Sequence, residues 1–212
     1  QGVVVYAGVD YARILEAAEN EAEVIVWDGG NNDTPFYFPD VHLVLFDPHR
    51  PGHELLYYPG ETNMLMADIA IINKVDTAET EKIRRVEENV RWVNPEAVIV
   101  HTASRITVDS PSGIKGRKVL VVEDGPTLTH GGMSFGAGVI ASKKYGAKEV
   151  VDPRPHATGS IIKVYEDFSH LGAVLPAMGY SAEQMKDLEM TINATDCDVV
   201  IAGTPIDLGR LL

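Results

Sequence analysis

A short apolar run, Ile69-Ala70-Ile71-Ile72, leads directly into the polar loop Asn73-Lys74-Val75-Asp76. A short, continuously apolar run predicts a strand that is covered on both faces of a parallel sheet. The polar loop then marks the carboxyl end of that strand, where open α/β sheets bind ligands. The stretch therefore predicts an α/β sheet with a ligand site at this edge.

The loop itself points to a guanine nucleotide. The carboxylate of Asp76 can accept hydrogen bonds from two N–H donors that guanine presents and adenine does not. The stem of Lys74 would lie over the base, and Asn73 would tie neighbouring loops together. An accidental turn with these residues is the alternative, and the position directly after an apolar strand favours the guanine interpretation.

Similar apolar runs recur on both sides of this stretch, and segments of helical period lie between them. Asp10 can cap one helix, Ile83 and Val86 begin the apolar stripe of another, and Ser181 with Gln184 forms a capping box ahead of a third. This alternation predicts an α/β fold with a doubly wound, mostly parallel sheet and helices on both faces. The further predicted strands are Val3–Tyr6, Val24–Trp27, Leu43–Phe46, Val98–Val100, Val119–Val122, Glu149–Val151 and Val199–Ala202.

A turn-rich stretch from Asp109 to Gly113 predicts a boundary between residues 1–108 and residues 109–212. The two parts can be separate domains or one extended sheet, and the sequence leaves both possibilities open.

The charge balance narrows the classes of partner. The chain has 31 acidic and 18 basic residues and a net charge of −13, which disfavours a nucleic-acid surface. Apolar runs stay well below the roughly 18 to 20 residues of a membrane-spanning helix. The single cysteine, Cys197, fits a reducing compartment and a buried packing role. We therefore expect a cytoplasmic protein with no nucleic-acid or membrane partner, and a homo-oligomer stays open.

The loop Asp28-Gly29-Gly30 follows the predicted strand Val24–Trp27. An acidic residue at a strand end, followed by glycines, is typical of loops that hold Mg²⁺ and let the backbone approach a terminal phosphate. Asp28 is thus the candidate metal ligand, and Gly30 a candidate phosphate contact. An ordinary glycine turn fits the pattern equally well.

Three small residues follow the strand after the Asn-Lys-x-Asp loop. Thr102, Ala103 and Ser104 could offer backbone N–H groups to the guanine oxygen, and they stand in the correct order along the chain. This loop alone is weak evidence.

A second polar loop follows the predicted strand Leu43–Phe46. It contains His49, Arg50, His53 and Glu54, which could bind an anion or a metal ion. The spacing matches no tetrahedral zinc site, so anion binding is favoured over a metal, and a solvated loop is the alternative.

In the second half, Thr129, His130, Gly131 and Gly132 precede the predicted helix Val139–Lys144. Hydroxyls, glycines and a helix N-terminus together predict a phosphate or carboxylate cradle, although close packing of a helix on a strand also requires glycine. Arg154 follows a later strand and could add a cationic contact.

The chain contains no Gly-x-x-x-x-Gly-Lys-Ser/Thr phosphate-binding loop. It opens, at Gln1, with a segment that reads directly as a strand. We therefore expect the phosphate-binding loop upstream of these residues.

Taken together, the motifs resemble the predicted GTPases of the cyclic 2,3-diphosphoglycerate synthetase family. The resemblance covers essentially the whole chain and rests on residues 27–33, 47–54, 73–76, 121–133 and 203–208. It implies a P-loop nucleotide-binding fold and closure of a small phosphorylated metabolite to a cyclic anhydride, driven by a nucleoside triphosphate. The synthetase activity is associated with ATP, whereas Asp76 favours GTP.

This resemblance leads to a hypothesis with assigned roles. We expect a Mg²⁺- and nucleotide-dependent phosphoryl-transfer enzyme in which Arg50, His49 and His130 are catalytic and a small phosphorylated metabolite is the partner. A GTP-controlled switch or a metallochaperone is the alternative. The second substrate would be bound by His53, Glu54, Thr129, Gly131, Gly132 and Arg154.

Overall fold

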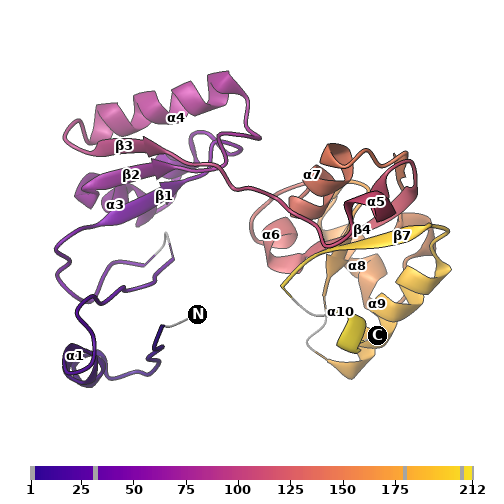
Figure 1. Cartoon of the computed structure of the whole chain (residues 1–212), viewed down its shortest axis with the longest axis horizontal. Helices are drawn as coiled ribbons and strands as arrows, with labels where there is room; N and C mark the ends of the chain where they lie inside the picture. The colour runs from indigo at the N-terminus through magenta and orange to yellow at the C-terminus, as the bar shows by residue number, and fades with distance from the viewer. Residues whose placement is uncertain (1–2, 31–32, 179–180, 206–207, 212) are drawn as a thin grey trace. The chain divides into compact units, whose positions relative to one another are not determined.

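The computed structural model describes residues 3–30, 33–178, 181–205 and 208–211 (Figure 1). The chain divides into two compact units, Gln1–Arg105 and Ile106–Leu212. Each unit has its own sheet, one of three strands and one of four. Of the two arrangements that the sequence left open, the structure has two separate sheets.

The sheet of the first unit consists of three parallel strands in the order β1-β2-β3. The strands are β1 (Leu43–Phe46), β2 (Ile69–Ile72) and β3 (Val98–His101). The helices of this unit are α1 (Tyr11–Glu19), α2 (His53–Leu56), α3 (Gly60–Met66) and α4 (Thr80–Val93).

One face of this sheet carries the core of the first unit. Alternate side chains of β1 and β2, such as Phe46 and Ile72, pack with Met64 of α3 and with Val86 and Val90 of α4. Figure 1 shows α4 lying along the sheet. The predicted stripe of α4 is therefore its buried face.

Two predictions in the first unit are wrong. Val3–Tyr6 and Val24–Trp27 form no strand, and most of their apolar side chains are exposed, with Val5 at 85% and Val26 at 82%. A strand is stable only where its backbone groups pair with a neighbour and its apolar side chains are covered. Among the described residues, these runs have no pairing strand, and β1 pairs only with β2.

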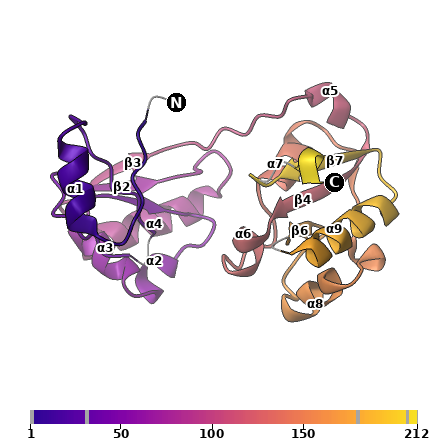
Figure 2. The ribbon, with the colours of Figure 1, turned by 90° about the horizontal axis from the view of Figure 1, so that it is seen from below.

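The second unit is built around β4 (Lys118–Asp124), which pairs in parallel with β5 (Glu149–Val150), β6 (Leu175–Ala177) and β7 (Val199–Gly203). Figure 2 shows helices around this strand. The surrounding elements are α5 (Pro111–Ile114), α6 (Gly125–Thr129), α7 (Ala137–Lys144), the 3₁₀ turn η1 (Arg154–His156), α8 (Ser160–Asp167), α9 (Ala182–Ala194) and α10 (Leu208–Leu211).

Successive side chains of β4 enter two different cores. Val119 and Val121 pack in one cluster with Leu128 of α6, whereas Leu120 and Val122 pack in another with helices α8 and α9. A strand that is buried on both faces is what its continuous apolar sequence predicts. The predicted α/β class, with parallel sheets flanked by helices, is therefore confirmed.

The helix starts follow the predicted caps. The Asp10 carboxylate accepts a hydrogen bond from the Arg13 N–H at 3.2 Å at the start of α1. At the start of α9, Ser181 and Gln184 form both hydrogen bonds of a capping box. Within the described residues, no helix is both long enough and apolar enough to cross a membrane.

Candidate functional site

Asn73 ties together the loops that follow β2 and β3. Its side-chain oxygen Oδ1 accepts hydrogen bonds from the Lys74 N–H at 2.8 Å, the Thr102 hydroxyl at 3.0 Å and the Ser104 hydroxyl at 3.2 Å. Its backbone N–H donates to the Phe46 carbonyl at the end of β1 at 3.0 Å. The Asn73 residue thus joins the carboxyl ends of all three strands of the first sheet.

Lys74 has an unusual backbone conformation, with φ of +60°. A non-glycine residue rarely adopts this left-handed region, and such residues cluster at binding sites where surrounding contacts hold them. Two contacts do so here. The Lys74 Nζ donates to Asp47 Oδ2 at 2.8 Å, and the neighbouring Val75 N–H donates to the Thr102 carbonyl at 3.2 Å.

Asp47, the first residue after β1, contacts two positively charged side chains at the carboxyl edge of the sheet. Its carboxylate contacts Lys74 and, at 3.2 Å, the Arg50 guanidinium, and it accepts the His49 N–H at 3.0 Å. Burial raises the pKa of the Asp47 carboxyl, but the contacts with Lys74, His49 and Arg50 outweigh burial and hold it below its usual value. We refer to Asp47, Asn73, Lys74, Thr102 and Ser104 as the strand-end site.

His49 and Thr77 connect this site to the loop that follows Lys74. The His49 Nε2 lies 3.0 Å from the Thr77 hydroxyl, which also lies 3.2 Å from the Lys74 carbonyl. Burial, followed by the positive charges nearby, lowers the pKa of His49 despite the opposing charge of Asp47. The neutral imidazole is therefore the favoured form in this environment.

Asp47 and Thr77 were not assigned a role from the sequence. Asp47 could have been found, because it directly follows a predicted strand at the ligand-binding edge. Thr77 lies beyond the four-residue motif, and its contact with His49 spans two loops that the sequence does not place together.

The other predicted residues of the first unit differ in their surroundings. Asp76 and Ala103 are exposed, and His53 lies on α2 with its ring 5.1 Å from that of Tyr57. The Glu54 carboxylate accepts the Gly52 N–H and the Asn89 amide N–H at 2.6 Å. Glu54 therefore links α2 to α4.

The predicted metal ligand Asp28 is exposed, and Gly30 donates its N–H to Asp33 Oδ2 at 3.0 Å. Among the described residues, no group of three or more His, Cys, Asp and Glu side chains is arranged to hold a metal ion.

In the second unit, the start of helix α7 holds an internal carboxylate. Glu123, which is 1% exposed, accepts the N–H groups of Gly136 at 3.0 Å, Gly138 at 3.2 Å and Val139 at 2.9 Å. An alanine Cβ at Gly203 would lie 2.5 Å from Glu123 Oε2, so glycine is needed for this close approach. The predicted cradle at α7 is thus filled by Glu123.

The remaining predicted residues of the second unit lie on α6, in the loop after it and at η1. Thr129 is buried, and its hydroxyl donates to the Gly125 carbonyl at 2.9 Å and lies 3.0 Å from Nδ1 of the exposed His130. Gly132 has φ of +63°, which favours glycine, and the Gly131 N–H donates to the Pro126 carbonyl at 2.9 Å. These contacts account for both glycines as parts of a helix C-terminal turn.

Arg154 forms an ion pair within its own turn. Its guanidinium contacts the Asp152 carboxylate through Nε and Nη2, at distances of 2.6 to 2.9 Å. The Asp152 carboxylate therefore already neutralises the cation that the sequence assigned to a substrate.

Comparison with known proteins identifies relatives for the whole chain. It is 61% identical, over all 212 residues, to arginine synthetase ArcE of Thermococcus kodakarensis, and it spans 47% of that protein. It is 27% identical over 139 residues to the cyclic 2,3-diphosphoglycerate synthetase of Methanothermus fervidus, covering 64% of this chain and 28% of that protein. A cyclic 2,3-diphosphoglycerate synthetase of Pyrococcus furiosus is 24% identical over 96 residues, covering 45% of this chain and 21% of that protein.

The chain thus spans about half the length of arginine synthetase and less of the others. The family model of the cyclic 2,3-diphosphoglycerate synthetase P-loop domain matches residues 2–103, which include β1, β2, β3 and the strand-end site. The resemblance predicted from the motifs is therefore confirmed: residues 2–103 match the P-loop domain of cyclic 2,3-diphosphoglycerate synthetase.

Proposed function

We propose that this chain is part of a nucleotide-dependent ligase that forms arginine, and that its strand-end site binds the base of the nucleotide. The observation that carries the nucleotide assignment is the side chain of Asn73, which bonds the loops after β2 and β3 simultaneously. The identity of 61% to a protein named arginine synthetase supports the product.

The geometry supports a base site because the side chains of the loop after β3 are bonded to Asn73. The Thr102 and Ser104 hydroxyls bond Asn73, so a ligand would meet the backbone of this loop rather than its hydroxyls. Asp76 is exposed one turn further along, where its carboxylate can accept the N–H groups of guanine. GTP is thus the proposed nucleotide, with ATP as the alternative.

Arginine is favoured over a multiply phosphorylated metabolite by how the predicted cations are paired. Arg50 and Lys74 both contact Asp47, and Arg154 contacts Asp152. A second substrate that carries several phosphates, bound beside the nucleotide, would have to displace these carboxylates in a chain of net charge −13. A product with a guanidinium group meets no such barrier.

Formation of a cyclic phosphoanhydride is the second candidate. It is favoured by the family model over residues 2–103 and by two relatives named for that reaction. Those relatives are only 24% and 27% identical over parts of the chain, so arginine formation takes precedence.

Ligation chemistry that ends in a guanidinium requires an activated carbon. The nucleotide would first phosphorylate the ureido oxygen. Ammonia would then attack the activated carbon, and phosphate would leave. Overall, a nucleoside triphosphate, a ureide and ammonia give a nucleoside diphosphate, phosphate and a guanidine. The protein would contribute positioning and charge neutralisation. Mg²⁺ would enter with the triphosphate.

The experiment uses the full-length protein with Mg²⁺, GTP or ATP, ammonia and the ureido amino acid of arginine's chain length. The expected result is arginine, detected by mass, in equal amount to the inorganic phosphate released. A parallel incubation with 2,3-diphosphoglycerate tests the second candidate. Cyclic anhydride without arginine would reverse the order of the two proposals.

A further inference from the structure

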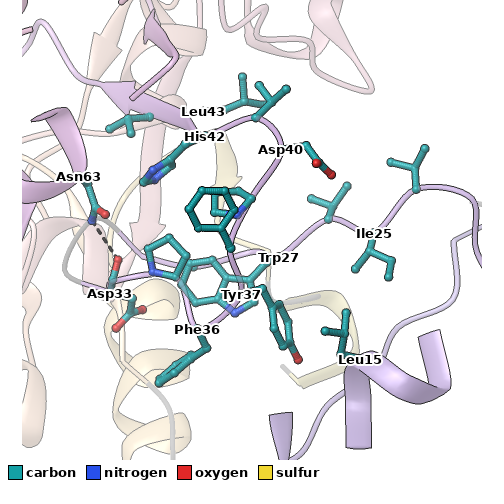
Figure 3. Close-up of a pocket in the computed structure, with 18 of the residues that line it drawn as sticks. Leu15, Ile25, Trp27, Asp33, Phe36, Tyr37, Asp40, His42, Leu43 and Asn63 are labelled. Atoms are coloured by element: carbon teal, nitrogen blue, oxygen red, sulfur yellow. Dashed lines mark hydrogen bonds between the residues drawn. The ribbon is translucent and has the colours of Figure 1, made fainter. Parts of the chain in front are cut away.

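A cavity in the first unit is distinct from the strand-end site. It has a volume of about 990 Å³ and lies between residues of the 15–41 segment, His42 to Leu45 and Asn63 (Figure 3). Pockets for small molecules fall roughly between 300 and 1,000 Å³. The cavity borders β1 along its side, whereas the strand-end site begins after β1 with Asp47.

Aromatic side chains form much of its wall, namely those of Trp27, Phe36, Tyr37 and Phe38. Their arrangement is held by specific contacts. Trp27 and Phe36 meet edge to face with ring centroids 6.1 Å apart, and the Tyr37 hydroxyl donates to the Tyr11 carbonyl at 2.8 Å. Phe36 is nonetheless 64% exposed and Phe38 is 100% exposed. Large aromatic rings left this open are typical of binding surfaces.

The charges around this wall all have the same sign. Four carboxylates line the cavity, those of Glu19, Glu23, Asp33 and Asp40, and none of the described lining residues is lysine or arginine. Figure 3 shows Asp33 and Asp40 on opposite sides of the Trp27 ring. Aromatic faces and carboxylates both attract organic cations, since the ring face and the anion are negative.

One polar atom of the cavity lining is still unsatisfied. The ring nitrogen Nδ1 of His42 is buried and has no hydrogen-bond partner among the described residues. A buried nitrogen of this kind costs free energy unless a ligand or water bonds to it.

We propose that this aromatic and acidic cavity, bounded by Trp27, Asp33, Asp40 and His42, binds a small molecule through a guanidinium group. The guanidinium is planar, stacks on aromatic rings and carries five N–H donors, which a simple ammonium does not. The choice of arginine as the natural ligand rests on the proposed function. The chemical class rests on the cavity alone.

The test compares ligands of equal shape and different charge. Because the chain has two tryptophans, Trp92→Phe, at a position 76% exposed, leaves Trp27 as the fluorescent reporter. This chain is titrated with butylguanidinium, butylurea and arginine. Butylguanidinium and arginine should change Trp27 fluorescence in a saturable way, and butylurea should bind at least about tenfold more weakly. Equal binding of butylurea, or no saturable change with any ligand, overturns the proposal.

A matched pair of variants on α1 tests the acidic wall. Glu19 lines the cavity and Glu16 on the same helix does not, so Glu19→Gln and Glu16→Gln remove the same charge at two positions of α1, one in the lining and one outside it. Glu19→Gln and Asp40→Asn should each weaken butylguanidinium binding by about two- to fivefold, and Glu16→Gln by less than about twofold. Equal effects of Glu19→Gln and Glu16→Gln would show general electrostatics rather than a site.

The outcomes separate this proposal from the proposed function. If the full-length protein forms no arginine but the cavity binds butylguanidinium, the cavity proposal stands and the function fails. If arginine is formed and none of the cavity variants changes ligand binding, the cavity proposal fails alone.

Discussion

Lys74 Nζ lies 2.8 Å from Asp47 Oδ2, so the cation of the Asn-Lys-x-Asp loop is held by the carboxylate that follows the neighbouring strand. The Asp47 side chain is 16% exposed and that of Lys74 is 40% exposed. This pair joins the ends of β1 and β2 and fixes the loop in which Lys74 has positive φ. It also removes Lys74 from the set of cations that could bind a substrate anion.

A double-mutant cycle measures this pair. We expect Asp47→Asn and Lys74→Met to couple by about 1 kcal/mol in the free energy of unfolding, because the lysine is partly screened by solvent. Asp47 has a folded-state pKa below its usual 3.8, so its contribution should be full above that pH and be lost as the pH falls through the folded-state value. Urea unfolding between pH 2 and pH 7 checks both expectations. If the effects of the two single substitutions simply add in the double variant, the expected coupling is contradicted.

His49 should titrate below the usual histidine pKa, because burial and the nearby cations disfavour its charged form. Lys74→Met removes one of those cations and should raise the pKa of His49. Arg91→Met, an exposed cation on α4 that is not among the causes of the His49 shift, serves as control. NMR titration of the imidazole resonances gives the values. An unchanged pKa in Lys74→Met would show that the two loops are not coupled electrostatically.

Asn73→Ala should destabilise the first unit by about 1 to 3 kcal/mol, since one change leaves three donors without their shared acceptor. Ser104→Ala removes only one of those donors and should cost less than about 1 kcal/mol. Denaturant unfolding of the two variants provides the comparison. Similar losses would mean that Asn73 does not act as the common acceptor.

We expect the contribution of Glu123 to stability to depend on pH in the direction opposite to that of Asp47. Burial raises the pKa of its carboxyl, although the backbone N–H groups of Val139, Gly138 and Gly136 oppose the shift. A raised pKa means that its contribution to stability is full below the usual glutamate value of 4.5 and is lost as the pH rises through the folded-state pKa. The stability difference between the native chain and Glu123→Gln should therefore decrease from pH 4 upward. A difference that grows with pH would show that the N–H groups outweigh burial.

The sequence predicted the fold well where local pattern and tertiary pairing agree. β2 and its loop were predicted because an apolar strand runs directly into polar residues, and α9 was predicted from the Ser181 and Gln184 capping box. β6 was not, because Leu175-Pro176-Ala177 is short and contains a proline. Val24–Trp27 has a strand composition but no strand to pair with among the described residues, and composition cannot reveal that.

The site was predicted in part for similar reasons. Asn73 was found because its loop has a recognisable pattern, and the structure shows the contacts that join it to Thr102 and Ser104. The glycine-rich stretch before α7 suggested a ligand cradle, and the sequence did not reveal that the N–H group of Gly136 donates to Glu123, 13 residues away along the chain. Spacing does not show which groups at a strand end already satisfy one another.

The most direct test of the proposed function is the initial rate of arginine formation by the full-length protein as a function of GTP and of ATP, in the native protein and in Asp76→Ala. We predict at least about tenfold higher efficiency with GTP, and loss of that preference in Asp76→Ala, because two charge-assisted hydrogen bonds to guanine are worth roughly 2 to 4 kcal/mol. Arginine formation at equal efficiency with both nucleotides would contradict the base assignment, and no arginine with either would contradict the proposed reaction.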